Sequence, residues 1–552
     1  MRNPDPNPLG SGARTVALGI FISRLAGFLR TSVLASLFGV GPHADVWQTA
    51  LRAPNLIQNL LGEQTLSATF IPIYVRLLCA GRREEARAFA GAILGLLLVI
   101  AGGLAFLGVL LARPLVAIFA AGYLGDAARV ASGAMAVDRY ELAVRAVRWM
   151  FPMTGLLVLA AWALGVLNSH RQFLLPYLSP VAWNAAILAG AAWGVWRGSP
   201  ETSRAELLSF WLEATCIGAL VGGVLQLAVQ LPFVFRLLGG LPLRFHWRTD
   251  PVREALRALP SALAGRGVVQ LSSYVDQLLA SLLAAGAVSA LGYAQTLYLL
   301  PLALFGSAMA AASLPELAAQ SQGPNVASLA RFTGEAVDRA LRWQIPASVV
   351  LSVLALPVVE GVFRLLPGAF GRAEGVLVAG VLALYAMGLP ASTGSRVVQS
   401  AFYALGDPKT PARLAGWRVG ISAGVGFVLM GILDRIELGT IPGMAGLEGS
   451  SLRWGAAGLA FGATVGAWYE RHRLFQELDR RFGGREWRSA RGSWWRLWVA
   501  LLLSLPAWAA VLALAALELP PSVQAAAGVG LVGVPYGLWE VWRRRDPDLK
   551  AR

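Results

Sequence analysis

Charged residues are scarce in this chain, and lysine is almost missing from it. Asp, Glu, Lys and Arg make up 14% of the 552 residues, whereas 56% are hydrophobic. A soluble globular domain carries about 25% charged residues, so this composition excludes an ordinary water-soluble protein. Because Lys409 and Lys550 are the only lysines, the net charge of +16 comes almost entirely from arginine. We therefore expect an all-α polytopic membrane protein whose functional cations are guanidinium groups.

Cysteine and histidine are also scarce, and several functional motifs are missing. The two cysteines, Cys79 and Cys216, fit no disulfide framework, and the four histidines have no metal-ligand spacing. There is no Walker-type phosphate loop and no nucleophile elbow. These absences argue against an ATP-driven pump, an enzyme and a resident cofactor, so energy must come from an ion gradient, the membrane potential or a partner. The basic residues fall in short loops between apolar runs, which argues against a nucleic-acid-binding protein.

Apolar runs long enough to cross a membrane recur along the whole chain. A helix needs about 20 residues to span a bilayer. We count fourteen such runs, and the second is too long for one straight crossing, so Pro54 and Pro72 are expected to kink it. The predicted spans are 13–38, 45–78, 88–120, 143–168, 173–197, 206–238, 255–283, 287–318, 337–366, 374–404, 411–433, 454–477, 494–517 and 521–542.

The distribution of arginine between the loops predicts the orientation. With the N-terminus in the cytoplasm, the inner loops hold roughly 30 Lys and Arg residues and the outer loops roughly 11, as the positive-inside rule requires. This bias needs an even number of spans, so it favours fourteen and places both termini in the cytoplasm. The N-terminal segment lacks a cleavable signal pattern, so the first span is expected to be retained.

A short internal repeat divides the chain. Leu-Ala-Ser at 34–36 is followed by Gln48-Thr49 and Pro54, and Leu-Ala-Ser at 279–281 is followed by Gln295-Thr296 and Pro301. The offset of about six helices is even, so the two halves are parallel repeats with a substrate cleft between them. We predict an N-lobe at 1–240, a C-lobe at 241–480 and an added C-terminal helix pair with a basic tail at 481–552.

Three arginines stand inside the first two apolar runs. Arg24 and Arg30 lie in the first run and Arg52 in the second. A charge at the bilayer centre costs about 2.5–3.5 kcal/mol on insertion scales, so such residues usually face a bundle interior or a wet cavity. Arg24 and Arg30 are nearly two turns apart, and two guanidinium groups on one cavity wall suit a phosphate-bearing anion. The alternative is that these side chains reach out to the membrane surface.

Four further residues extend the candidate site. Arg266, between two glycines of the seventh span, would add a phosphate contact. Asp276, in the same span, is a candidate Na⁺ or H⁺ coupling site, or the ion-pair partner of an arginine. Glu63, in the second span, is a candidate gating residue that pairs with an arginine, or a proton carrier. Asp45 follows the GVGPHA turn, where helix N-capping would explain it without any transport role.

Several blocks of the sequence resemble one known family. SRLAGFLR, GVGPHAD and RAPNLIQNLLGEQTLSATFIPIY are similar to the N-terminal signature of the MurJ (MviN) lipid II flippases, and four later blocks follow in the same order within residues 15–420. The later blocks are LNSHRQFLLPYLSPVAWN, QLSSYVDQLLASLLAAG, YAQTLYLLPLALFGSAMAAASLPELA and FYALGDPKTP. The resemblance implies a multidrug/oligosaccharidyl-lipid/polysaccharide exporter fold with alternating access in the bacterial cytoplasmic (inner) membrane. The implied substrate is an undecaprenyl-diphosphate-linked disaccharide pentapeptide used in peptidoglycan synthesis.

The same resemblance assigns roles to individual residues. It implies substrate-binding arginines at Arg24 and Arg30, gating carboxylates at Asp45 and Glu63, and a sodium-site carboxylate at Asp276. This sequence departs from the family pattern at five positions, so the resemblance does not determine which head group is transported. They are Thr31, Gln58, Asn59, Gln295 and Thr296.

Three other functions stay open at this stage. The chain could flip another polyprenyl-linked glycan, or export cations as a small-molecule antiporter of the same superfamily, although an arginine-rich cavity argues against cations. It could also be a non-transporting scaffold that recruits cell-wall synthesis enzymes through loop charges such as Arg480 and Arg481.

Overall fold

The computed structural model describes residues 8–199, 201–240, 248–321, 326–366, 368–440, 447, 450–484 and 491–545. Within these ranges the chain is helical, and the only extended pairing is an isolated bridge between Glu437 and Arg453. The predicted all-α polytopic fold is confirmed.

Contacts divide the chain into two compact units, and the first comprises Met1–Leu34 and Pro42–Leu278. Its helices are α1 (Pro8–Phe38), α2 (Pro42–Leu61), α3 (Glu63–Thr69), α4 (Ile71–Cys79), α5 (Arg83–Leu110), α6 (Ala112–Phe119), α7 (Asp126–Ala131), α8 (Arg139–Ser169), α9 (Leu174–Arg197), α10 (Arg204–Leu238) and α11 (Asp250–Ser281). The last turn of α1 and the last residues of α11 belong to the second unit.

The second unit comprises Ala35–Gly41 and Leu279–Arg552. Its helices are α12 (Ala287–Pro301), the π-helical turn η2 (Leu302–Ser307), α13 (Ala308–Ser321), α14 (Val326–Val353), α15 (Ala355–Phe363), α16 (Arg372–Ala386), α17 (Leu389–Ala404), α18 (Lys409–Leu433), α19 (Gly455–Phe482), α20 (Arg491–Ala516) and α21 (Pro521–Arg545). The predicted lobes at 1–240 and 241–480, with 481–552 as an addition, stay an interpretation of the repeat.

Helices occupy all fourteen predicted spans, although several spans are interrupted. By length and composition, eight described helices could cross a membrane, or up to eleven when each of three sharply bent pairs counts as one. The predicted spans that fall outside this count are those of α2–α4, α11, α19 and α21.

Three of the interruptions have the same cause. In each case a helix ends four residues before a proline, which has no backbone N–H to donate to the carbonyl four positions back. The pairs are Leu110 with Pro114, Val353 with Pro357, and Ala386 with Pro390. Consequently the predicted spans 88–120, 337–366 and 374–404 each consist of two helices, and the last two bend by 81° and 41°.

The second predicted span is also broken, but not where Pro54 stands. Helix α2 continues through Pro54, and the breaks fall at Gly62 and at Phe70, two residues before Pro72. Glycine disfavours a helix interior because its backbone loses the most freedom there. Interruption of this span is therefore confirmed next to Pro72, whereas at Pro54 the helix is not interrupted.

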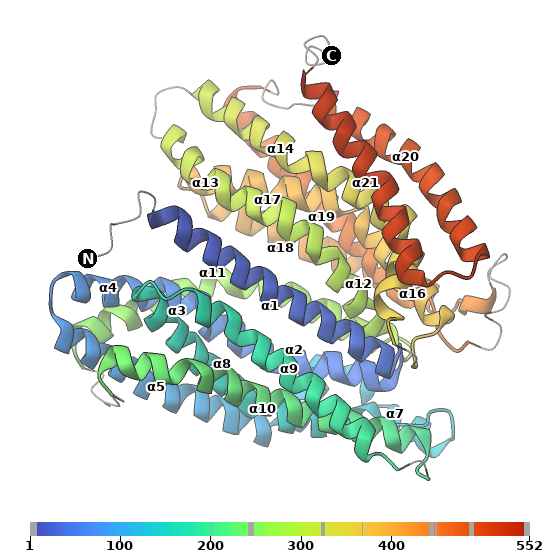
Figure 1. Cartoon of the computed structure of the whole chain (residues 1–552), viewed down its shortest axis with the longest axis horizontal. Helices are drawn as coiled ribbons and strands as arrows, with labels where there is room; N and C mark the ends of the chain where they lie inside the picture. The colour runs from blue at the N-terminus through green and yellow to red at the C-terminus, as the bar shows by residue number, and fades with distance from the viewer. Residues whose placement is uncertain are drawn as a thin grey trace. The chain divides into compact units, whose positions relative to one another are not determined.

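Helix α8 is the core element of the first unit. It packs against α2, α5 and α10, and Figure 1 shows α5, α8 and α10 running alongside one another. Trp162 of α8 is fully buried and donates to the Ala90 carbonyl of α5 at 3.1 Å. Phe70 stacks on Phe89, with ring centroids 5.3 Å apart, and closes the interior between α3, α4 and α5. This apolar packing positions the polar residues that α1, α2 and α11 contribute.

Candidate functional site

Arg30 is a half-buried cation of α1. Its guanidinium carbon lies 5.0 Å from the centroid of the Trp183 ring on α9, a cation–π distance. Its Nε and Nη1 atoms are buried, and no group in the described part of the chain accepts a hydrogen bond from them. An unsatisfied buried donor is expensive, more so when it is charged. The arrangement therefore leaves Arg30 with unused capacity for an anion.

A second unused polar atom lies on the face of α9 that meets α1. Asn184 directs its amide nitrogen to the Pro180 carbonyl at 2.8 Å, while its buried Oδ1 has no partner among the described residues. A Cβ placed on Gly27, one turn before Arg30, would stand 3.8 Å from that oxygen. The small residue lets the backbone of α1 approach Asn184 closely. Polar groups of α1 and α9 thus lie close together where these two helices meet.

Arg24 has different surroundings from Arg30. Its side chain is exposed, as are those of its neighbours Phe21 and Leu25. Six residues along a helix correspond to a rotation of about 120° between the two arginines. Arg30 therefore turns toward α9, whereas Arg24 occupies a neighbouring, open face of α1.

Asp45 anchors a buried ion network that the sequence does not reveal. Arg139, at the start of α8, binds both oxygens of Asp126, with its Nε 2.6 Å and its Nη2 3.2 Å from them. The Nη1 atom of Arg139 is 3.5 Å from an Asp45 oxygen, and Asp45 and Asp126 are fully buried. The Arg139 guanidinium also stacks over Tyr123, 4.3 Å from the ring centroid. One cation thus holds two carboxylates inside the first unit.

The N-cap explanation of Asp45 was wrong. Helix α2 begins at Pro42, so Asp45 is inside its first turn rather than at the residue before it. Its position still suits a carboxylate, because a negative charge near a helix N-terminus interacts favourably with the helix dipole. The ion pair with Arg139 gives Asp45 a structural reason to be buried.

Helices α2 and α11 meet through polar contacts of the first unit. Gln277 donates to the Thr49 hydroxyl at 2.8 Å, and Tyr274 donates to the Arg52 carbonyl at 3.2 Å. Thr49 also bonds the Tyr123 hydroxyl at 3.1 Å, which links this contact to the Arg139 network. Asp276 stands between Tyr274 and Gln277 in the sequence and is partly buried. The structure thus brings the segment around Asp276 to the helix that carries Asp45 and Arg52.

For two predicted site residues the structure describes the backbone but not the side chain. Glu63 begins α3 and Arg266 lies within α11, but only their backbone positions are described. No group of three or more His, Cys, Asp or Glu residues is arranged to hold a metal ion in the described part of the chain. A sodium ion at Asp276 would therefore depend on hydroxyl and carbonyl oxygens in addition to the carboxylate.

Three residues of this site were missed by reasoning from the sequence. Asp126 and Arg139 read as loop charges between predicted spans, and Trp183 reads as an apolar residue of the fifth span. The one signal available was that Arg139 immediately follows an acidic residue and precedes a long apolar run. Pairing across 94 residues, as between Asp45 and Arg139, has no local sequence signal.

Comparisons with known proteins give a consistent family. The sequence model described as "Lipid II flippase MurJ" matches residues 34–524. A "Probable lipid II flippase MurJ" of Rhizobium tropici is 30% identical over 464 residues, covering 83% of this chain and 79% of the relative. The relative of that description from Bdellovibrio bacteriovorus is 31% identical over 423 residues, covering 75% of each.

This chain belongs to the MurJ lipid II flippase family. Membership makes it a transporter of the membrane, which confirms the family resemblance of its sequence blocks and favours a flippase over a cation antiporter. A solved structure of "Lipid II flippase MurJ, inward closed conformation" matches 96% of this chain and 99% of its own length, with a TM-score of 0.67 at 19% identity.

A solved structure from another transporter family has a similar fold. A "multidrug resistance MATE family transporter of the MOP superfamily" in an inward-facing conformation matches 85% of this chain and 96% of its own length. The TM-score is 0.61 at 16% identity, so this likeness concerns the fold alone.

Proposed function

We propose that this protein flips lipid II, the undecaprenyl-diphosphate-linked peptidoglycan precursor, from the inner to the outer leaflet of the bacterial cytoplasmic membrane. Alternating access moves the head group, and Arg30 binds the diphosphate. The observation that carries this proposal is the Arg30 guanidinium, whose buried Nε and Nη1 have no hydrogen-bond partner among the residues that the structure describes. Arginine presents a planar fork that matches phosphate oxygens, and a ligand that accepts from these donors removes the cost of burying them.

Other residues of the first unit take supporting roles in this mechanism. Arg24, on the open face of α1, makes the first contact with the anionic head group, and Arg52 and Arg266 add positive charge. Asp45 and Glu63 are the gating carboxylates. Asp276 couples transport to Na⁺ or H⁺, because a carboxylate next to hydrogen-bonded polar side chains is a suitable oxygen ligand.

The orientation and partners follow from the same proposal. Both termini lie in the cytoplasm, since that arrangement puts most of the loop arginines inside. Cell-wall synthesis enzymes use the product on the outer face. The five departures from the family pattern, Thr31 among them, alter contacts to the head group rather than the reaction.

Genetic complementation tests this function. Bacteria depleted of their own lipid II flippase should grow when they express the wild-type chain and stop growing when they express Arg30→Gln at an equal level. Arg148→Gln, which removes an exposed arginine of α8, is the matched control and should support growth. Failure of the wild-type chain to restore growth in a strain that expresses it in the membrane would contradict the proposed function.

A further inference from the structure

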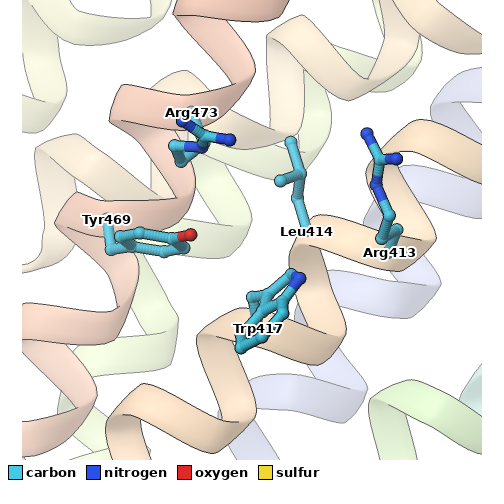
Figure 2. A pocket seen from close by; sticks show the side chains of 5 residues that line it. All are labelled: Arg413, Leu414, Trp417, Tyr469 and Arg473. Carbon is cyan, nitrogen blue, oxygen red and sulfur yellow. The ribbon is translucent and has the colours of Figure 1, made fainter.

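A surface pocket of about 330 Å³ lies between α18 and α19 in the second unit. Figure 2 shows side chains from the two helices facing one another across it. Its volume is at the lower end of the range of small-ligand sites, about 300–1,000 Å³. The lining residues are Arg413, Leu414 and Trp417 from α18, and Tyr469 and Arg473 from α19.

The pocket begins where close packing of the two helices ends. A Cβ on Gly462 of α19 would stand 2.6 Å from the backbone nitrogen of Gly426 on α18, so only glycine permits that approach. One turn further, a Cβ on Gly466 would stand 2.9 Å from the Arg418 carbonyl. Beyond Gly466 the facing residues are arginine, tryptophan and tyrosine. Their large side chains line the pocket and keep the two helix backbones from approaching as closely as at the glycines. The pocket is thus built into the way these helices pack.

The pocket presents two cations that lack a carboxylate partner. In the described part of the chain neither Arg413 nor Arg473 forms an ion pair, and Arg473 contacts only the neutral Gln476, at 3.4 Å. Helix α18 contains no acidic residue. The nearest acid along α19, Glu470, pairs instead with Arg418 at 3.0 Å. Two exposed guanidinium groups on facing helices therefore form a positively charged site open to an anion.

An exposed apolar surface continues from the pocket along α18. Trp417 is 60% exposed, and Val428 and Ile432 are 60% and 56% exposed. Their spacings of eleven and four residues put them on one face of the helix. Helix α18 is long and apolar enough to cross a membrane, so this face suits acyl chains. Trp and Tyr at the charged end are typical of the membrane–water interface.

We propose that this pocket binds the phosphate group of an anionic glycerophospholipid, whose acyl chains lie along the exposed face of α18. The guanidinium groups of Arg413 and Arg473 donate to the phosphate oxygens, Trp417 and Tyr469 flank the head group, and the apolar face covers the start of the chains. Basic pockets between membrane helices recognise anionic head groups by this combination of charge and apolar contact. The site is separate in the sequence from the residues proposed to bind lipid II, and it does not depend on that function.

Native mass spectrometry of the full chain in detergent tests the site. The protein is titrated with dioleoylphosphatidylglycerol, with dioleoylphosphatidylcholine and with inorganic phosphate. The wild type should bind phosphatidylglycerol more tightly than phosphatidylcholine, and excess inorganic phosphate should not displace it. The double variant Arg413→Ala/Arg473→Ala should bind phosphatidylglycerol roughly thirtyfold more weakly, as expected for the loss of two interfacial arginines.

A matched double variant controls for the loss of charge. Arg435→Ala/Arg453→Ala removes two exposed arginines from the opposite end of the same helix pair and should leave the affinity unchanged. Arg413→Gln/Arg473→Gln keeps a longer, polar side chain than alanine and should weaken binding as much as alanine does. This variant provides the test if the alanine variant does not fold. The proposal would be overturned if the pocket variants bound phosphatidylglycerol as tightly as the wild type does. It would also be overturned if the control variant lost as much affinity as the pocket variants, or if inorganic phosphate displaced the lipid.

Discussion

The guanidinium group of Arg30 stacks on the indole ring of Trp183, 5.0 Å from its centroid, inside the first unit of the fold. The contact fixes the direction of the cation without using its hydrogen-bond donors. The indole itself is held by a hydrogen bond from its Nε1 to the Ala219 carbonyl at 3.2 Å. Helix α10 therefore supports α9, and α9 supports the cation of α1, while the donors of Arg30 stay available to an anion.

Substitution of Trp183 tests this support. Trp183→Leu removes the ring and should lower lipid II flipping in reconstituted vesicles by up to roughly thirtyfold, because a cation–π contact at a desolvated site contributes about 2 kcal/mol. Trp183→Phe keeps an aromatic face but loses the hydrogen bond to Ala219, and it should retain most of the activity. Equal activity of the leucine and phenylalanine variants would show that the ring does not position Arg30.

Removal of Arg139 should destabilise the first unit strongly. Arg139→Ala removes the buried cation that Asp45 and Asp126 share, and breaking a buried pair in this way costs about 3–5 kcal/mol. Thermal unfolding in detergent measures the effect. Arg129→Ala is the control, because Arg129 also contacts Asp126, at 3.5 Å, but is half exposed and should cost less than about 1 kcal/mol. Similar losses of stability in both variants would contradict a special role for the buried pair.

The C-terminal helix pair should depend on one buried arginine. Arg496 of α20 is fully buried and binds both oxygens of Asp338 on α14, at 2.5 and 3.0 Å. Arg496→Met should therefore destabilise the second unit by about 3–5 kcal/mol and speed hydrogen exchange in α20. Adding Asp338→Leu to that variant removes a carboxylate that then retains, among the described residues, only Arg342, at 3.5 Å, and should restore part of the stability. If the double variant is less stable than Arg496→Met, loss of the Arg496–Asp338 pair does not explain the lower stability.

Asp407 should make the start of α18 sensitive to acid. Its carboxylate accepts from the Thr410 hydroxyl at 2.7 Å and from the Lys409 and Thr410 backbone amides at 3.1 Å each, and it pairs with Arg481. Hydrogen bonds from Thr410, followed by the contribution of Arg481, lower the pKa of Asp407 to about 2. A lowered carboxyl pKa stabilises the fold above the unfolded pKa of about 3.9, and this stabilisation is lost as pH falls toward 2.

The comparison of wild type with Asp407→Asn measures that contribution. The variant should be less stable by about 0.3–1 kcal/mol at neutral pH, because Asn keeps a capping oxygen but loses the charge that pairs with Arg481 and interacts with the helix dipole. The difference should shrink when unfolding is followed from pH 5 down to pH 2. Thr410→Val removes the largest cause of the lowered pKa and should shift the acid transition to higher pH. A difference that is constant over this pH range would rule out Asp407 as its source.

The sequence predicts the helical fold well and the site only in part. Apolar runs are local, so hydropathy locates fourteen helical segments, and the length of the second run together with its prolines indicates that it is interrupted. The breaks at Leu111, Leu354 and Met387 could also have been predicted, because a proline three residues further on removes a hydrogen bond of the preceding turn. Arg30 could be identified because a cation within an apolar run is costly.

The partners of these residues could not be predicted from one sequence. Trp183 carries no mark that distinguishes it from the other tryptophans of the chain, and Arg139 reads as a loop charge. Both acquire their roles from packing between helices that are far apart in the sequence. The pocket between α18 and α19 is a further case, because it depends on where glycine contacts such as that of Gly462 end.

Binding of lipid II to purified Arg30 variants tests the central claim most directly. Native mass spectrometry with the wild type, Arg30→Gln and Arg30→Lys measures the affinities without a transport step. Loss of charged hydrogen bonds to the diphosphate should weaken binding by at least about tenfold in Arg30→Gln, with an intermediate effect in Arg30→Lys, which keeps the charge but not the planar fork. Unchanged lipid II affinity in a folded Arg30→Gln protein would contradict the account.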